Sequence, residues 1–255
     1  MTRVALPSGF LACPIAHRAL HGPGAPENSR AAMQAAIAHG FGIEIDLQLS
    51  ADGVAMVFHD DKLDRLTAEN GPVRARDAAE LGRIDLDFTA EGIPTFAEIL
   101  RLIDGRVPLL VELKDQSGML GPSDGRLEAA ASDDVSGYDG PLAFMSFSPD
   151  MVGHVAETAP ERPRGLVTCA FRPHAWPTLP VEHLSALARI EAAEAVGASF
   201  ISHQWTDLHS ARVAELKADG RAILCWTIKS AAEEVQARQI ADNITFEHYI
   251  PGVPA

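Results

Sequence analysis

Gly42-Ile43-Glu44-Ile45-Asp46-Leu47 is an apolar run that carries two acids at alternate positions. In a β-strand, residues two apart point to the same side, so Glu44 and Asp46 share one face of the predicted strand. Burying a charge without a partner costs several kcal/mol or more, so a folding core alone does not account for this pair. The strand is therefore predicted to contribute both to the fold and to a functional site.

Similar short apolar runs alternate with amphipathic helical patterns along the whole chain. The predicted strands cover 12–17, 42–48, 107–113, 141–146, 164–169, 198–202, 222–227 and 241–246. The predicted helices cover 29–39, 95–103, 149–158, 181–196, 210–219 and 230–239. Repeated strand–helix alternation implies parallel strands with right-handed crossovers. Eight strands in 255 residues predict an α/β fold, a (β/α)₈ TIM barrel that forms a single domain over residues 1–255.

A doubly wound open sheet is the competing architecture, and periodicity alone does not exclude it. No glycine fingerprint for a dinucleotide follows the first predicted strand, which argues against that alternative. Ser29 after Asn28 predicts a helix start and Gly40 a helix end, and Ser210 and Ser230 are similar candidate caps. The interval 50–94 is too long for an ordinary connection and predicts a short excursion after strand two. Residues 116–141 are expected to form a long loop around one short helix.

Composition limits the classes of partner. The formal charge of -14 and the lack of a Lys/Arg run argue against nucleic acid and against a polybasic membrane anchor. No segment approaches the roughly 20 apolar residues of a membrane span, so no membrane insertion is expected. The region 1–11 does not resemble a secretory signal, and Cys13, Cys169 and Cys225 are interpreted as reduced core residues. A cytoplasmic protein is expected, and its oligomeric state is left open.

Further polar residues lie at or near the ends of other predicted strands. His17 and Arg18 close the first strand, His59 closes Val57-Phe58-His59, and Glu112 with Lys114 lies on the strand 107–113 or just after it. In a barrel these side chains would converge near the C-terminal mouth, where barrel enzymes place their chemistry.

Three carboxylates held close together repel one another unless something neutralises them. Glu44, Asp46 and Glu112 offer only oxygen ligands, which favour a hard divalent cation, Mg²⁺ or Ca²⁺, over zinc. Simple ion pairs with neighbouring Arg or Lys are the alternative.

The histidines and cations complete a reactive set. His17 and His59 can divide acid and base roles near neutral pH, and Arg18 and Lys114 suit an anionic oxygen such as phosphate. Together these groups suit displacement at a phosphorus ester.

The chain resembles the glycerophosphodiester phosphodiesterase family across nearly its whole length. The resemblance is specific because its motifs share order and spacing, whereas any one of them alone would be weak. They are 16–18 (AHR), 26–29 (PENS), 42–46 (GIEID), 52–53 (DG), 58–60 (FHD), 63–67 (LDRLT), 93–96 (IPTF), 111–114 (VELK), 146–148 (SFS) and 226–227 (WT).

The resemblance implies a barrel fold and hydrolysis of a small-molecule glycerophosphodiester to glycerol 3-phosphate and an alcohol. It implies metal ligands, for Mg²⁺ or Ca²⁺ with Mn²⁺ as a further candidate, at Glu44, Asp46 and Glu112. It also implies acid/base histidines at His17 and His59, with His17 assigned as base and His59 as acid. Phosphate contacts are implied at Arg18 and Lys114. Attack by the substrate's own 2-hydroxyl, through a cyclic phosphate, and direct attack by water both stay open.

The chain departs from the family pattern in a few places. Ala19 stands where glycine is usual, and 245–249 (TFEHY) replaces a Thr-Asp-aromatic-Pro run at the end of the last strand. His21 and His203 add imidazoles near the expected mouth. These departures bear on substrate identity.

Three aromatic residues are candidates for an alcohol pocket. Phe147, Trp205 and Trp226 end or follow predicted strands, although packing against the barrel rim is an equal interpretation for each. Two other functions stay open: a phospholipase-D-type barrel acting on lysophospholipids, and a non-catalytic phosphodiester-binding protein.

Overall fold

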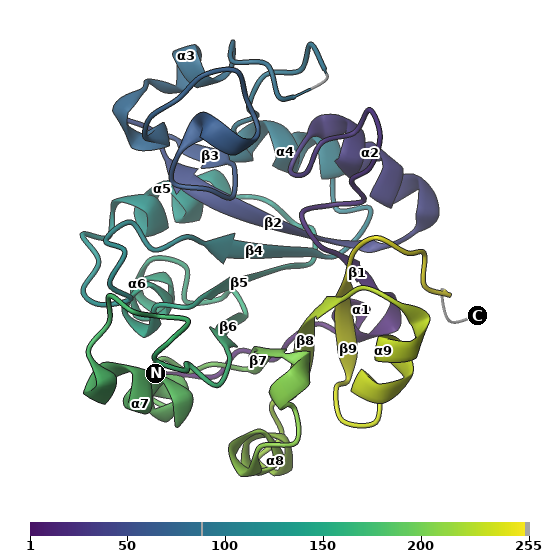
Figure 1. Cartoon of the computed structure of the whole chain (residues 1–255), viewed down its shortest axis with the longest axis vertical. Helices are drawn as coiled ribbons and strands as arrows, with labels where there is room; N and C mark the ends of the chain where they lie inside the picture. Colours follow the sequence, from purple (N-terminus) through teal and green to yellow (C-terminus); the bar gives the residue numbers. More distant parts are fainter. Residues whose placement is uncertain (88, 253–255) are drawn as a thin grey trace.

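The computed structural model describes residues 1–87 and 89–252. Within them, eight parallel strands close into a barrel and a ninth strand extends its sheet (Figure 1). The barrel strands are β1 (Ile15–Ala16), β2 (Gly42–Leu49), β4 (Leu109–Leu113), β5 (Leu142–Ser146), β6 (Arg164–Thr168), β7 (Phe200–Gln204), β8 (Ala222–Ile228) and β9 (Asn243–Phe246). The predicted (β/α)₈ barrel is confirmed, and closure excludes the open sheet.

Closure depends on the shortest strand. β1 pairs in parallel with both β9 and β2, through Ile15 opposite Thr245 and Gly42. The first and last barrel strands of the chain are therefore neighbours, and every barrel strand has a partner on each side.

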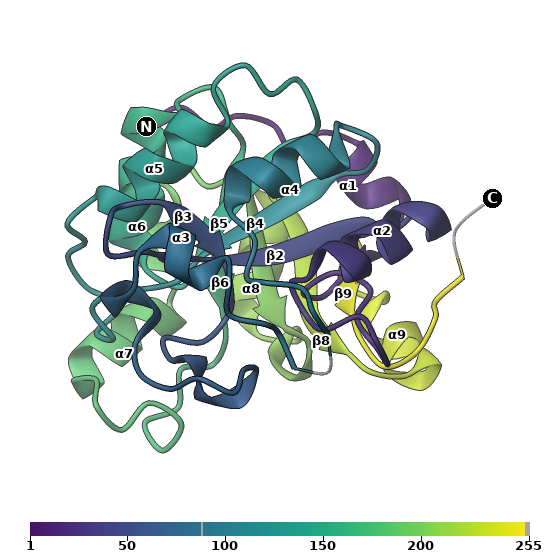
Figure 2. The same cartoon turned by 90° about the horizontal axis from the view of Figure 1, so that it is seen from above.

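Helices surround the strands (Figure 2). They are α1 (Gly9–Ala12), α2 (Arg30–His39), α3 (Ala78–Leu81), α4 (Phe96–Ile103), α5 (Arg126–Asp134), α6 (Pro149–Thr158), α7 (Val181–Ala188), α8 (Ala211–Ala218) and α9 (Ala231–Ala237). None of the helices that the structure describes is both long and apolar enough to cross a bilayer.

The alternation of side chains along each strand creates two apolar layers. Ile43, Ile45 and Leu47 point outward into the core shared with the helices. Leu110 and Val167 point inward, where Phe10 from α1 joins the small interior core. Packing thus fills the deeper part of the barrel, so polar inward-facing groups gather towards its C-terminal end.

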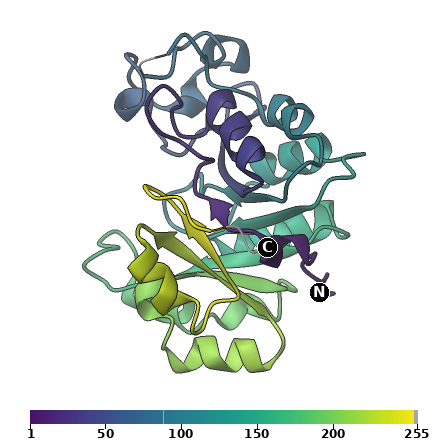
Figure 3. The same ribbon diagram turned by 90° about the vertical axis from the view of Figure 1, so that its right-hand side faces the viewer.

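The predicted excursion after strand two is a small folded unit with its own apolar cluster, which includes Met56, Phe58 and Leu63. It contains β3 (Ala55–Val57), α3 and the 3₁₀ turns Leu63–Arg65 and Val73–Ala75. β3 runs antiparallel to the end of β2, which extends past the barrel. The excursion and α8 lie at opposite ends of the molecule (Figures 1 and 3).

Local signals for helix ends are borne out in part. Ser29 caps α2 by accepting a hydrogen bond from the Ala32 N–H, and Gly40 ends it with φ 71°. Ser230 caps α9 through its side chain, whereas Ser210 precedes α8 without a side-chain bond. The three thiols are unpaired, and Cys169 and Cys225 are buried as expected, whereas Cys13 is only half-buried.

Candidate active site

Three carboxylates meet inside the barrel near its C-terminal end. Glu44 and Asp46 come from β2 and Glu112 from β4, with Asp46 directly opposite Glu112 in the parallel register. The first two are 1% exposed and Glu112 is 8% exposed. One oxygen atom of each lies within 4.8 Å of the others. The pattern of alternate acids in the sequence thus produces one buried acidic cluster.

Two cations lie against this cluster. The Lys114 ammonium is 2.7 Å from Glu112 Oε1 and 3.3 Å from Asp46 Oδ1. Arg18 Nε lies 3.6 Å from Asp46 Oδ2, and the Arg18 backbone N–H donates to Glu44 Oε2 at 2.8 Å. The predicted phosphate-binding residues therefore border the predicted metal ligands.

The cluster has capacity for a further positive charge. Burial, together with Asp46 and Glu112, raises the pKa of Glu44 well above its ordinary value. Burial opposes ionisation of Asp46 too, but Lys114, His59 and Arg18 hold its pKa below the ordinary value. Among the described residues, nothing donates a hydrogen bond to the buried Glu44 Oε1. A carboxylate set with a free buried oxygen fits a divalent cation.

The segment before α2 orients these groups. Asn28, buried with φ 60°, donates from Nδ2 to Asp46 Oδ2 at 2.9 Å. Its neighbour Glu27 accepts from Arg18 Nη1 at 2.9 Å and from Arg65 Nη2 at 2.6 Å. Glu27 therefore ties the end of β1 to the excursion.

His17 lies at the end of β1 against a carboxylate from the end of β9. Its Nδ1 is 2.7 Å from Glu247 Oε2. Burial lowers the pKa of His17, and the bond to Glu247 opposes that effect.

His59 is anchored in the same way from the opposite direction. Its Nδ1 is 2.6 Å from Asp60 Oδ1, and Arg65 Nε donates to Asp60 Oδ2 at 2.7 Å. β3 brings His59 back to β2, where Gln48 Nε2 donates to its carbonyl oxygen at 3.0 Å. Because each imidazole uses Nδ1 for a carboxylate, Nε2 is the nitrogen left to exchange a proton with a substrate.

These groups line one cavity of about 430 Å³. The structure brings together nine of the ten predicted site residues there: His17, Arg18, Glu44, Asp46, His59, Glu112, Lys114, Phe147 and Trp226. Trp205 is not among the lining residues, because it lies in a 3₁₀ turn after β7 and packs against the outer core. His21 lines the cavity, whereas His203 is buried beside Thr168 and Asp207.

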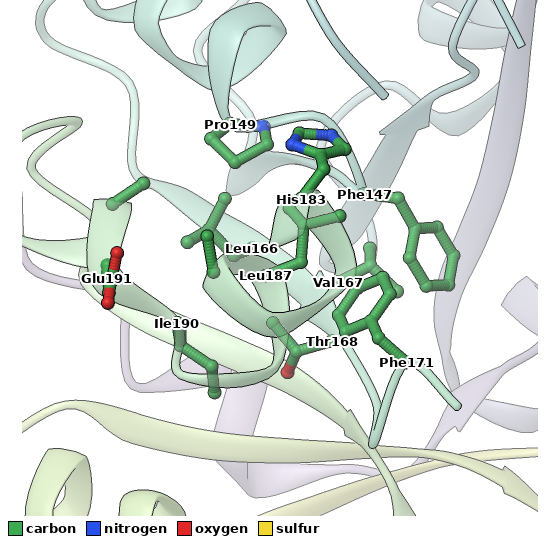
Figure 4. Close-up of a pocket in the computed structure, with 12 residues that line it drawn as sticks. Phe147, Pro149, Leu166, Val167, Thr168, Phe171, His183, Leu187, Ile190 and Glu191 are labelled. Carbon is green, nitrogen blue, oxygen red and sulfur yellow. The ribbon is translucent and has the colours of Figure 1, made fainter. Parts of the chain in front are cut away.

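Phe147 stands between this cavity and an apolar one of about 310 Å³. Its ring packs edge-to-face on Trp226 at 5.6 Å and on Phe171 at 6.2 Å between centroids. Leu166, Leu187 and Ile190 line the apolar cavity behind it, next to α7 (Figure 4). The three carboxylates, the two histidines and the two cations of the predicted site line the first cavity, on the other side of Phe147.

Several groups at the site had no role assigned from the sequence. Glu27 and Asn28 stand in a quoted motif, but their contacts to Arg18 and Asp46 depend on how the loop folds back. Lys229 and Glu247 are ordinary surface-type residues in a linear sequence. Only the pairing of β9 with β1 brings Glu247 to His17, so a reliable strand order could have found it.

Comparison with known proteins places the arrangement in context. The sequence profile of the glycerophosphoryl diester phosphodiesterase family matches residues 17–244. The Bacillus subtilis (strain 168) protein YhdW, assigned by its name to the glycerophosphodiester phosphodiesterases, is 28% identical over 242 residues, covering 91% of this chain and 93% of its own.

Solved structures of similar proteins agree with this family match. An Oleispira antarctica phosphodiesterase in complex with the product sn-glycerol-3-phosphate has a TM-score of 0.77 and 27% identity, covering 93% of each chain. A glycerophosphodiester phosphodiesterase from Thermotoga maritima, at 19% identity, shares the fold with a TM-score of 0.70, over 92% of this chain and 94% of its own.

Proposed function

Because the chain belongs to the glycerophosphoryl diester phosphodiesterase family and is thus a phosphodiester hydrolase, we propose that it converts a glycerophosphodiester to glycerol 3-phosphate and an alcohol. The observation that carries the proposal is one cavity lined by three buried carboxylates and two carboxylate-anchored histidines. The product held by the Oleispira antarctica relative supports it. The single domain over residues 1–255 and the cytoplasmic location stay predictions.

Glu44, Asp46 and Glu112 would hold a divalent cation, Mg²⁺ or Ca²⁺ with Mn²⁺ as a further candidate. Their oxygen-only donor set and the free Glu44 Oε1 support this choice. Such a cation would offset the three negative charges and withdraw charge from a phosphoryl oxygen.

The chain's own residues would then bind the diester and move its protons. Arg18 and Lys114 contact phosphate oxygens, which are anionic throughout the reaction. His17 removes the proton from the attacking hydroxyl, of the substrate or of water, as the new O–P bond forms. His59 gives a proton to the alcohol oxygen as its P–O bond breaks. Where the substrate's own hydroxyl attacks, the product of this step is a cyclic phosphate, which water then opens to glycerol 3-phosphate.

The test is release of glycerol 3-phosphate from glycerophosphocholine and glycerophosphoethanolamine by metal-stripped enzyme, with Mg²⁺, Ca²⁺ or Mn²⁺ then restored. Metal-dependent release is expected from the wild-type chain and from the control E215Q, which changes an exposed glutamate on α8. Glu112→Gln should lose both metal affinity and release. Binding of a diester without release would instead make the protein a non-catalytic sensor.

A second candidate substrate class is the lysophospholipids, as in phospholipase-D-type barrels. The apolar cavity behind Phe147 is the observation that favours it, because an alkyl chain needs an apolar surface beside the phosphate site. Lysophosphatidylcholine belongs in the same assay. Turnover of lysophosphatidylcholine, with none of either glycerophosphodiester, would replace the first proposal by the second.

A further inference from the structure

Glu247 follows β9 directly and lies outside the motifs that carry the family resemblance. Its side chain is 11% exposed and lines the catalytic cavity. A carboxylate in such a position needs partners, because burial removes most of its solvent.

The partners of Glu247 are three imidazoles and an ammonium, and one of the imidazoles is His248, whose Nε2 lies 3.4 Å from Oε1. Oε2 is 2.7 Å from His17 Nδ1 and 3.6 Å from His21 Nε2. Oε1 is 2.7 Å from the Lys229 ammonium, which comes from the end of β8. The bonds to His17 and His21, with support from Lys229, hold the pKa of Glu247 below its ordinary value.

An ionised carboxylate has only acceptors, so the bond to His17 requires a proton on His17 Nδ1. In a neutral imidazole with its proton on Nδ1, the free lone pair is on Nε2, which can then accept a proton. Arg18 and Asp46 on β2 also act on His17, and His21 and His248 share its partner Glu247. Among the residues that the structure describes, Glu247 is the one whose side chain hydrogen-bonds the His17 ring.

We propose that Glu247 is a positioning residue for His17. It fixes the ring orientation and the Nδ1–H tautomer, and Lys229 holds Glu247 in place. The catalytic consequence rests on the proposed function, in which His17 accepts a proton through Nε2.

The other imidazole shows why this partner matters. His59 takes its carboxylate from the next residue, Asp60, which Arg65 holds in place. His17 has no acid beside it in the sequence and uses one that is 230 residues away. In both pairs, a cation contacts a carboxylate and that carboxylate binds Nδ1 of the imidazole. The two carboxylates nevertheless come from unrelated places in the sequence.

The first test reads the tautomer directly and needs no substrate. Nitrogen-15 NMR of histidine-labelled protein should show His17 protonated at Nδ1, with its signal assigned through H17A. Glu247→Ala should lose this preference, and Glu247→Asp should retain part of it. The control Glu234→Ala removes a glutamate on α9 that binds Tyr249 instead, and should leave the signal unchanged. An unchanged tautomer in the folded Glu247→Ala variant would overturn the proposal.

The second test measures steady-state kinetics on the diester that the wild-type chain hydrolyses. Glu247→Ala should lower kcat by about 10–100-fold with little change in KM, in line with the loss of other orienting partners. Glu247→Asp should recover part of kcat. A rise in KM alone would contradict a positioning role. If the wild-type chain turns over no diester, the proposed function fails, while the tautomer measurement still decides the Glu247–His17 assignment.

Discussion

At the scale of single residues, the proposed mechanism distinguishes groups that would exchange protons from groups that hold other side chains in place. His17 and His59 each keep one ring nitrogen bound to a carboxylate, and Asn28 holds one oxygen of Asp46. Changes to the first kind should affect rate. Changes to the second kind should affect the property of the group that they hold, which is rate for Glu247 and metal binding for Asn28.

Replacing His17 by Ala should lower kcat by roughly 10²–10⁴ while the fold and the metal affinity stay unchanged, because the ring supplies a proton acceptor and no ligand. Single-turnover kinetics, with metal titration and circular dichroism alongside, would measure this. Near-normal turnover would show that another group is the base.

Replacing Asn28 by Ala should weaken binding of the divalent cation by about 10–100-fold, because Asp46 loses its orienting donor. Isothermal titration with Mg²⁺, Ca²⁺ or Mn²⁺ provides the measurement. Asn70→Ala, at an exposed position of the excursion, is the matched control and should bind the metal normally. Equal affinity in both variants would contradict the role of Asn28.

The sequence predicts site residues well where the signal is local. Glu44 and Asp46 follow from the two-residue period of a strand. The role of Glu247 is not predicted, because its partner His17 lies on the other side of the barrel closure, where β9 pairs with β1. Trp205 shows the reverse problem, since its place after a strand predicts neither the 3₁₀ turn nor the side on which the ring packs.

At the scale of elements, α4 begins with a reciprocal cap. Thr95 Oγ1 accepts from the Glu98 N–H at 3.2 Å, and Glu98 Oε2 accepts from the Thr95 N–H at 2.9 Å. Replacing Thr95 by Ala should cost about 1 kcal/mol and lower Tm by about 2–4 °C.

Differential scanning calorimetry of T95A would measure this effect. Ser210→Ala is the matched control, because Ser210 precedes α8 without a side-chain bond. Its cost should stay within about 0.5 kcal/mol. Equal losses in the two variants would mean that the capping bonds are not the cause.

Element boundaries are predicted less well than element types. The expected strand 12–17 shrinks to two residues, because only Ile15 and Ala16 pair with both neighbours. The expected helix 181–196 ends at Ala188, where Ile190 takes a left-handed conformation with φ 49° and turns its side chain into the core. The amphipathic pattern of the sequence continues through this turn, so the pattern does not show where the helix ends.

At the scale of the whole molecule, a cation held by the acidic cluster would link folding to metal binding. A cation that binds only the folded chain stabilises it by about 2.7 kcal/mol at 100 times its Kd. Thermal unfolding of metal-stripped protein should therefore shift upward as Mg²⁺, Ca²⁺ or Mn²⁺ is added. Glu112→Gln should abolish or reduce the shift, and an equal shift in that variant would place the metal elsewhere.

Stability should also fall between pH 7.5 and 5.5. Burial lowers the pKa of His203, although Asp207 opposes the effect. The folded state therefore takes up the proton less readily than the unfolded state, whose histidine pKa is about 6.5. The contribution of neutral His203 to the free energy of unfolding is therefore present above about pH 6.5 and is lost as the pH falls below that value.

Urea unfolding at the two pH values tests this sign. The midpoint should be lower at pH 5.5, and His203→Gln should reduce the difference. A difference that is unchanged in the variant would assign the effect to other groups.

The two-residue β1 finally has a consequence for synthesis on the ribosome. Its second neighbour, β9, and the partner of His17 are translated some 230 residues later, which takes roughly 10–50 s at usual elongation rates. Until then the nascent chain can form at most an open sheet with unpaired edges, the state in which strands pair wrongly or aggregate. We expect chaperone dependence during translation to end when β9 emerges.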